Sequence, residues 1–540
     1  MKHLLSDEAF RSYLIDGYVV IDPVSLGDDF HDFLYQKAEG IYELVKNAKT
    51  KTPHLDIIGD NLRAQIPLID RLLEDPGVSG ALTSILGKDY VLHPHNFVHR
   101  SGPADQGFHQ DGNLPWNERG HYRSHHPDWA ILFYYPQQVT LLNGPTEILK
   151  GSQYWTTDFE KEDGDWYRGD PIDRTEKRNL LGGDDLQRRD LQLEQEIQSL
   201  GVPDVERLFL TLPKGSAVIC NYDIFHRGSR SLEGQASRYM YKFHFMRTSM
   251  PESAAWDHLN SDLKIEDVRK ELHPVINHIW NWSKGGLSEE KDTMTKIDVD
   301  ELRGALRSPD ESKRIETAYL LAMIRNSEGE DLLFEALEDD LESTRRAGCY
   351  GIKASKAPDI DRLIKLAHAE RISTRRMAVY ALGGHVLLNE KEVVAALIER
   401  LKFDEDDLVR SNSAYALGQV VRQAGHYYAS EIIDVLIERL CPGVELDNTE
   451  VALMPRSTVR QSIAYALVQA SANHEFTNQQ LGNLIDAGLD DNDRYVQGLT
   501  VEALRMVKEV EKQTVDRVLT VLSRTRLSQT PVWVEEGNTQ

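Results

Sequence analysis

Two patterns of apolar residues divide the chain near residue 300. Before that point, apolar residues gather in short runs of strand length separated by Gly, Pro and Asn turns: YVVID, DYVLHPHNFVHR, WAILFYYP, SAVICN and RYMYKFHFMR. A helical lead-in, DEAFRSYLIDG, precedes them. After residue 300, apolar residues recur at helical spacing in stretches such as EVVAALIERL and EIIDVLIERL. The pattern predicts a multidomain α+β protein, with a β-rich first part and an all-α second part.

The second part repeats itself. In five aligned segments an arginine is followed five positions later by a tyrosine: Arg314/Tyr319, Arg345/Tyr350, Arg375/Tyr380, Arg410/Tyr415 and Arg460/Tyr465. A sixth segment, RYVQGLTVEAL from 494, has Gln497 and Glu502 at these two places. Helix pairs of this length cannot bury their apolar faces alone, so they are expected to stack into an α-solenoid over 300–525. We expect the arginines to pair with acidic turn residues of neighbouring repeats and the tyrosines to lie in the core.

The first part, residues 1–281, is expected to be a β-sandwich or barrel with flanking helices. The glycine-rich, charged segment 282–299 is the predicted linker, and 526–540 forms a C-terminal tail. An acidic stretch that contains tryptophan covers 156–201. It is either a solvated surface insertion or a lid over a site, since long excursions within compact domains tend to be functional or disordered.

Composition narrows the classes of function. Asp plus Glu number 87 against 62 Lys plus Arg, a formal net charge of −25, which disfavours nucleic acid or an anionic membrane as a partner. Cys220, Cys349 and Cys441 are scattered without a CxxC pair, so neither a disulfide framework nor a cysteine zinc site is expected. The N-terminus lacks a signal-peptide core and no apolar run approaches membrane-spanning length. These features predict a cytoplasmic protein.

Candidate metal ligands lie in GFHQDGNLPW, residues 107–116. In an extended chain, residues i and i+2 point to the same side, so His109 and Asp111 can converge on one ion. A later run, GSAVICNYDIFHRGSRS, ends in a turn that presents His226. Two histidines and one carboxylate form the facial triad that suits non-haem Fe(II), with open positions for a chelating cosubstrate and dioxygen. A structural zinc site would instead be closed by four ligands.

The run at 238–247 adds a candidate anion site. Its alternation places aromatic side chains on one face of a strand and, on the other, Arg238, Met240, Lys242 and His244. An arginine on a face that lines a cavity can bind a carboxylate through two parallel hydrogen bonds. Arg238 follows His226 closely enough to reach the far end of a dicarboxylate held by the metal. Arg230 and Arg247 are the alternatives for this role.

Other histidines and aromatic residues carry weaker expectations. His121, His125 and His126 lack a paired carboxylate at strand or helix spacing, so they are expected to be loop residues or substrate contacts. Trp116 and the aromatic run 133–135 are either core residues or walls of a substrate pocket.

Taken in order, these motifs resemble the phytanoyl-CoA dioxygenase family of Fe(II)/2-oxoglutarate oxygenases. The resemblance runs from LSDEAFRSYLIDGYVVID through GFHQDG and LLNGPTEILKGSQYW to DIFHRGSRSLEGQASRYMYKFHF. It implies a double-stranded β-helix, a jelly-roll or cupin-like barrel, with Fe(II) as cofactor and 2-oxoglutarate and O2 as cosubstrates. It implies His109, Asp111 and His226 as iron ligands, Arg238 on the C5 carboxylate of 2-oxoglutarate and Asn96 as a further cosubstrate contact. The carboxylate at Asp111 implies hydroxylation and not halogenation.

The second part resembles HEAT-like repeats of the bilin-lyase type, on the pattern of residues 407–410. Together the two resemblances imply a hydroxylase of an unidentified small-molecule or carrier-bound substrate. Its repeats would recruit a protein partner, present the substrate or mediate homodimerisation. The alternative is a HEAT-repeat scaffold whose barrel is catalytically secondary. A bilin-lyase-like chromophore enzyme would rest on the repeats alone.

Overall fold

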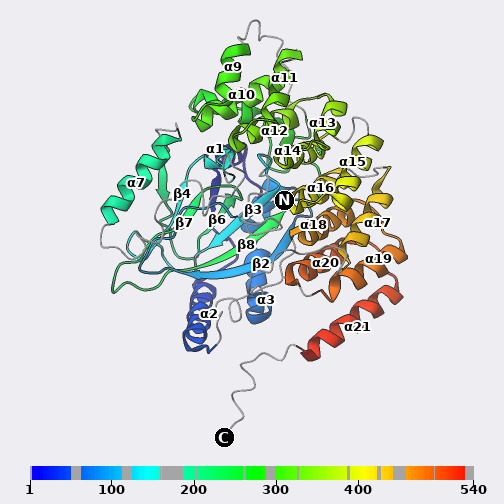
Figure 1. Ribbon diagram of the computed structural model, residues 1–540. Coiled ribbons are helices and arrows are strands. Elements are labelled where there is room, and N and C mark those ends of the chain that lie inside the picture. The colour runs from blue at the N-terminus through cyan, green and yellow to red at the C-terminus, as the bar shows by residue number, and fades with distance from the viewer. Residues whose placement is uncertain are drawn as a thin grey trace.

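The computed structural model describes residues 3–49, 62–111, 124–158, 160, 186–200, 205–259, 263–286, 299–324, 327–385, 390–422, 427–441, 458–491 and 493–528. A part that mixes helices and strands lies beside a long row of paired helices (Figure 1). No helix within these ranges has both the length and the apolar character needed to cross a membrane. The predicted linker lies largely outside the described residues, as do most of the 156–201 stretch and of the C-terminal tail.

The first part begins with helices that pack on a sheet. They are α1 (Asp7–Asp16), α2 (Asp28–Asn47), α3 (Leu62–Gln65), α4 (Asp70–Leu73) and α5 (Pro76–Leu86), followed later in the chain by α7 (Leu186–Ser199) and α8 (His273–Ser283). Local sequence fixes their ends: the Ser6 side chain accepts the Ala9 N–H at the start of α1, and Gly17 ends it at φ +82°. At α5, Asp75 caps the first turn and Pro76 occupies the first helical position.

The described strands form two antiparallel sheets. They are β1 (Tyr18–Ile21), β2 (Val91–Arg100), β3 (Trp129–Tyr134), β4 (Thr146–Leu149), β5 (Arg207–Phe209), β6 (Ala217–Asn221), β7 (His226–Gly228) and β8 (Tyr239–Met246). One sheet has the order β1-β6-β3-β8-β2 and the other β5-β4-β7. The sheets face each other, since Tyr135 donates a hydrogen bond to Thr146 Oγ1 at 2.8 Å, and they are not joined into a closed barrel by the described strands.

The alternation predicted for β8 is confirmed. On the outer face, the Tyr241 hydroxyl donates to the Leu34 carbonyl of α2 at 2.7 Å, and Tyr239 packs edge-on against Tyr35. On the inner face, Met240 contacts Thr146 and Lys242 reaches Asp111. The five-stranded sheet therefore has an aromatic face against the helices and a polar face toward the smaller sheet.

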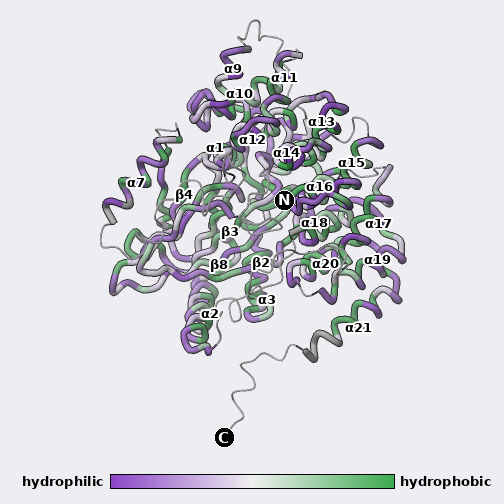
Figure 2. The backbone as a smooth tube through the Cα atoms, in the orientation of Figure 1, coloured by the Kyte–Doolittle hydropathy of each residue, from purple (hydrophilic) through white to green (hydrophobic). Residues whose placement is uncertain are grey.

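The second part is built from helix pairs. The row next to the sheets is α10 (Glu311–Met323), α12 (Glu342–Ala354), α14 (Ile372–Leu382), α16 (Asp407–Val421), α18 (Thr458–Asn473) and α20 (Arg494–Met506). After α9 (Val299–Leu306), the outer row is α11 (Ser327–Ala336), α13 (Ile360–Leu366), α15 (Glu390–Phe403), α17 (Ala429–Leu440), α19 (Asn478–Leu484) and α21 (Lys512–Ser528). Hydrophobic and hydrophilic positions alternate along these helices, as packing into two rows requires (Figure 2).

The recurrent arginines connect repeats, as expected, in two cases. Arg375 pairs with Asp404 at 2.9 Å, and Arg460 pairs with Asp491, each partner lying in the turn before the next inner helix. Two earlier arginines instead reach the segment that follows β4. Arg314 donates to the Thr156 hydroxyl at 3.0 Å, and Arg345 pairs with Glu160. The start of the 156–201 stretch is therefore bound along the first repeats.

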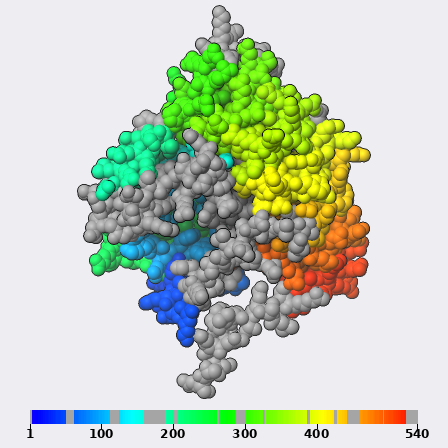
Figure 3. Space-filling view, in the orientation of Figure 1, coloured from blue at the N-terminus to red at the C-terminus, as the bar shows by residue number. Residues whose placement is uncertain are grey.

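The recurrent tyrosines lie in the buried core, as expected, and several of them contact the mixed part of the chain. Tyr319 and Tyr350 contact His125, the first by a 2.9 Å hydrogen bond and the second by stacking at 3.7 Å between ring centroids. Further along, Tyr465 lies against Trp129, with ring centroids 5.1 Å apart. The inner row of helices thus packs on the mixed part of the same chain. Figure 3 shows the repeats as one continuous run of atoms, from green through yellow to red, along one side of the molecule.

Candidate metal centre

His109 and His226 lie side by side because their backbones pair. The His109 N–H donates to the His226 carbonyl at 3.0 Å, and the reverse bond is 2.9 Å. Asp111 lies two residues beyond His109, and the Nε2 atoms of the histidines lie 4.0 Å and 3.9 Å from its Oδ1. Among the described residues, this is the only group of three or more His, Cys, Asp or Glu side chains with potential ligand atoms all within 4.8 Å of one another. The structure thus brings together the three predicted ligands.

Both histidine rings are held in the tautomer that a metal ligand needs. His109 Nδ1 lies 2.9 Å from the Gly107 carbonyl, and His226 Nδ1 lies 3.1 Å from the Ile224 carbonyl. Because a carbonyl only accepts, each Nδ1 carries a proton, and in the neutral ring this leaves the Nε2 lone pair on the side of Asp111. Burial, followed by the neighbouring His109, lowers the pKa of His226 to about 3. A neutral His226 is the form that binds a metal.

Asp111 has basic partners on its other side. Lys242 Nζ lies 2.7 Å from Oδ1 and 2.6 Å from Oδ2, and His244 Nε2 lies 3.1 Å from Oδ2. Burial alone would raise the pKa of the Asp111 carboxyl, but Lys242, His226 and His244 hold it well below its usual range. The sequence placed Lys242 and His244 on the inner face of β8 but gave them no role. Alternation identifies that face, yet it does not show which of its residues reach Asp111.

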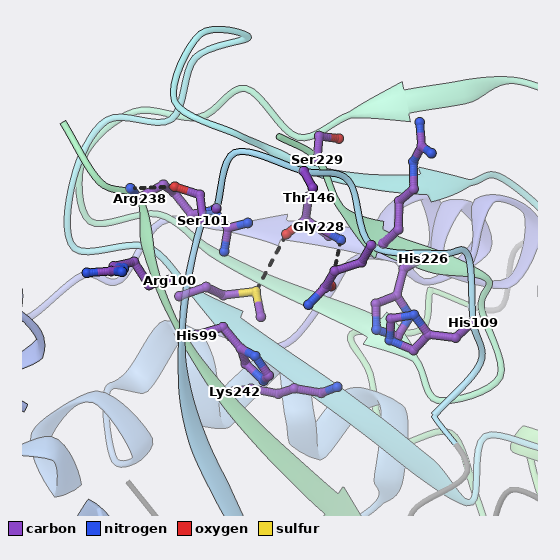
Figure 4. Close-up of a pocket in the computed structure, with 15 residues that line it drawn as sticks. His99, Arg100, Ser101, His109, Thr146, His226, Gly228, Ser229, Arg238 and Lys242 are labelled. Carbon is purple, nitrogen blue, oxygen red and sulfur yellow. Dashed lines mark hydrogen bonds between the residues drawn. The ribbon is translucent and has the colours of Figure 1, made fainter. Parts of the chain in front are cut away.

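Arg238 borders the same cavity, which has a volume of about 80 Å³ and is lined also by His99, Gln106, Met240 and Lys242. Figure 4 shows His109 and His226 together at one side of this pocket, with Lys242 extending into it from β8. Arg238 Nε donates to the Gly144 carbonyl at 2.7 Å, and a Cβ placed on Gly228 would lie 3.4 Å from its Nη2. The guanidinium therefore lies close to the strand that begins with His226.

Arg238 is buried, 3% exposed, and no carboxylate of the described residues forms an ion pair with it. Burial lowers its pKa from the ordinary arginine value. The two alternatives have other partners. Arg230 pairs with Asp105 at 2.9 Å, while Arg247 donates to the backbone carbonyls of Ile85 and Pro127. Of the three arginines, Arg238 alone lines the cavity.

Asn96 is not brought into the cavity. It stands opposite Phe243 in the sheet, on the face of β8 that points away from Met240 and Lys242, and its Nδ2 donates to the Pro94 carbonyl. The residues of β2 that line the cavity are His99, paired with Met240, and Arg100. The register of β2 shifts between Leu92 and Asn96, and an irregularity of this kind changes which side chains share a face.

The remaining candidate histidines and aromatic residues contact other parts of the chain or lie outside the described residues. Trp116 and His121 lie outside the described residues. His125 contacts the tyrosines of the repeats, and His126 stacks on Trp282 with ring centroids 4.0 Å apart. Phe133 lies against His226, with ring centroids 5.4 Å apart, and so borders the metal centre.

Comparisons with known proteins give two kinds of result. A profile of HEAT repeats matches residues 360–441, which confirms the HEAT-like assignment over that range. No curated protein matches the chain.

Solved structures that resemble the chain include non-haem iron enzymes. SnoK, a non-haem α-ketoglutarate-dependent carbocyclase from nogalamycin biosynthesis, is 16% identical to this chain; the match covers 45% of this chain and 85% of SnoK, with a TM-score of 0.30. EctD from S. alaskensis with bound Fe has 13% identity, covers 48% and 83%, and gives 0.32. AviO1 from Streptomyces viridochromogenes has 14% identity, covers 46% and 99%, and gives 0.31. None of these three proteins is named as a phytanoyl-CoA dioxygenase.

Proposed function

We propose that the chain is an Fe(II)- and 2-oxoglutarate-dependent dioxygenase that hydroxylates a small-molecule or carrier-bound substrate. One observation carries the proposal: two Nε2 atoms and one carboxylate oxygen lie within 4.8 Å of one another, and the two histidines line a cavity that is also lined by a buried guanidinium. A donor set of two imidazoles and one carboxylate fits ferrous iron with open positions. A buried arginine without a carboxylate partner in the described residues fits an anionic ligand.

The proposed roles follow from this arrangement. His109, Asp111 and His226 would hold Fe(II), and Arg238 would bind the C5 carboxylate of 2-oxoglutarate. With O2 and 2-oxoglutarate, iron bound there supplies the oxidising power that places one oxygen atom in a substrate C–H bond while succinate and carbon dioxide form. The protein itself would fix the ligand tautomers through the Gly107 and Ile224 carbonyls and orient the reacting groups beside the metal.

The proposal includes a fold and domain boundaries. The two facing antiparallel sheets would be the halves of a double-stranded β-helix in an oxygenase domain over 1–281, followed by the 282–299 linker, the solenoid over 300–525 and the tail. The inner row of the solenoid is covered by the oxygenase domain. A protein partner, or a second copy of the chain, would therefore bind the outer row, α11 to α21.

The test measures succinate formed from 2-oxoglutarate by the purified full chain, with and without Fe(II), under air. We expect turnover that requires Fe(II) and is lost in His109→Ala. The control is His368→Ala, because His368 lies in the turn after α13 and its side chain is 37% exposed. Turnover that persists in His109→Ala, or that is lost equally in both variants, would contradict the assignment. A metabolite pool with the active protein would then be searched for a product heavier by one oxygen.

A further inference from the structure

The repeats contact the oxygenase domain on the side of the proposed metal centre where His244 lies. Tyr495, in α20, places its hydroxyl 2.9 Å from Nδ1 of His95 in β2. The His95 ring stacks on His244 with centroids 5.3 Å and planes 24° apart, and His244 Nδ1 lies 3.3 Å from the His95 carbonyl. His244 Nε2 in turn lies 3.1 Å from Asp111 Oδ2. A short series of contacts thus joins the solenoid to a proposed metal ligand.

The close approach of α20 to β2 depends on two residues that break regular structure. Pro94 lies where the register of β2 shifts, and a proline at such a position cannot donate to the ladder. Facing it, Gly498 has no side chain, and a Cβ there would lie 2.5 Å from Pro94 Cβ. Tyr495 precedes Gly498 by three residues and so lies on the same face of the helix. The irregular part of β2 is therefore the part that α20 holds.

The hydroxyl of Tyr495 has a second partner. Arg494 Nη2 donates to it at 3.1 Å, so the hydroxyl is hydrogen-bonded to both Arg494 and His95 Nδ1. His93, on the other side, packs its ring 5.8 Å from that of Tyr495. These contacts fix the His95 ring, and a fixed His95 leaves His244 one position against Asp111.

We propose that Tyr495 is a positioning residue of the metal centre, acting through His95 and His244 on Asp111. The inference rests on the proposed function, because it requires that Asp111 bind a metal. The solenoid would then do more than stabilise the fold. Its sixth repeat would orient the Asp111 carboxylate through Oδ2, the oxygen that His244 contacts, while His109 and His226 lie near Oδ1. Partners that orient ligands in this way contribute to metal affinity, typically by 10- to 100-fold when they contact the ligand directly.

The test compares two conservative variants. Tyr495→Phe removes only the hydroxyl. The matched control is Tyr319→Phe, because the Tyr319 hydroxyl also lies 2.9 Å from a histidine Nδ1, that of His125, in the same interface. The metal-free full chain is titrated with Co(II), whose visible absorption reports both its affinity and its ligand geometry. Because Tyr495 acts through two intervening residues, we expect Tyr495→Phe to weaken Co(II) binding by about 3- to 10-fold and to alter the spectrum. Tyr319→Phe should stay within twofold of the wild type.

A second pair of variants tests the same contact without changing a polar group. Gly498→Ala would push α20 from Pro94, whereas Gly304→Ala in α9 meets nothing within 4 Å. We expect only Gly498→Ala to weaken Co(II) binding. If the wild type binds Co(II) tightly and both Tyr495→Phe and Gly498→Ala bind it equally well, the positioning role is wrong while the metal centre stands. If the wild type itself does not bind Co(II), the proposed function fails and this inference fails with it.

Discussion

The ion pair between Asp128 and Arg422 joins the sheet domain to the repeats, and breaking it should destabilise the whole chain. Arg422 Nη2 lies 2.7 Å from Asp128 Oδ1, and each side chain is 2% exposed. Asp128→Asn keeps the shape but leaves the guanidinium buried without its counter-charge. Removing one partner of a buried pair costs about 3–5 kcal/mol, because the remaining charge is not solvated. We expect a loss of this size in the free energy of unfolding.

Urea unfolding followed by tryptophan fluorescence measures this loss. Trp129 is next to Asp128 and contacts Tyr465 of the repeats, so its emission reports on this interface. A double variant, Asp128→Asn with Arg422→Met, should recover much of the stability, because no charge is then left buried. The control is Glu335→Gln, since Glu335 and Arg303 are 54% and 52% exposed and such pairs contribute about 0–1 kcal/mol. A cost below about 1 kcal/mol for Asp128→Asn would refute the reasoning.

The same pair predicts a pH dependence. Burial alone would raise the pKa of Asp128, but Arg422 and His126 hold it well below its usual range. A carboxyl whose pKa is depressed in the folded state contributes stability above its unfolded pKa of about 4, and this contribution is lost as the pH falls toward the folded pKa. The difference in stability between the wild type and Asp128→Asn should therefore be complete at pH 7 and smaller at pH 3.

Three further predictions concern the cosubstrate, the thiols and the solenoid. Arg238→Lys should raise the 2-oxoglutarate concentration for half-maximal succinate formation by about 10-fold or more, since lysine lacks the planar guanidinium that binds a carboxylate through two hydrogen bonds. Arg230→Lys should leave this concentration unchanged. Equal effects of the two variants would contradict the role of Arg238. A thiol reagent should modify Cys441 in the folded protein, but Cys220 and Cys349 only after unfolding. Both of these cysteines are buried, and burial raises the pKa of Cys349 to about 12. Rapid modification of all three thiols in the folded protein would contradict this burial. A chain ended at residue 295 should be aggregation-prone in light-scattering assays, since it exposes the surface that the repeats cover; a stable monomer would contradict that.

Much of the metal centre was predictable from local sequence. His109 and Asp111 are two residues apart in an extended segment, and His226 follows an apolar strand, so order and spacing suffice to find them. Arg238 was preferred over its alternatives because alternation along β8 places it on the polar face, and it does line the cavity. Asn96 was implied by the family resemblance alone, and it does not line the cavity, because the irregularity around Pro94 changes which side chains of β2 share a face.

The relation between the two parts of the chain was not predictable. The period of the repeats shows that helices pair and that tyrosines recur, but it does not show what covers the inner row. Tyr319 and Tyr465 are buried against His125 and Trp129, residues far away in sequence. The contact of Tyr495 with His95 could not be predicted from the repeat pattern, because the sixth repeat lacks the arginine and tyrosine that mark the other five.

The central claim is that His109, Asp111 and His226 bind iron and that Arg238 binds the cosubstrate beside it. The most direct test is a crystal structure of the full chain grown without oxygen in Fe(II) and 2-oxoglutarate, with anomalous diffraction collected at the iron edge. We expect one anomalous peak bonded to both Nε2 atoms and to a carboxylate oxygen of Asp111, with a 2-oxoglutarate carboxylate on the Arg238 guanidinium. No peak at these three residues, or 2-oxoglutarate bound away from Arg238, would contradict it.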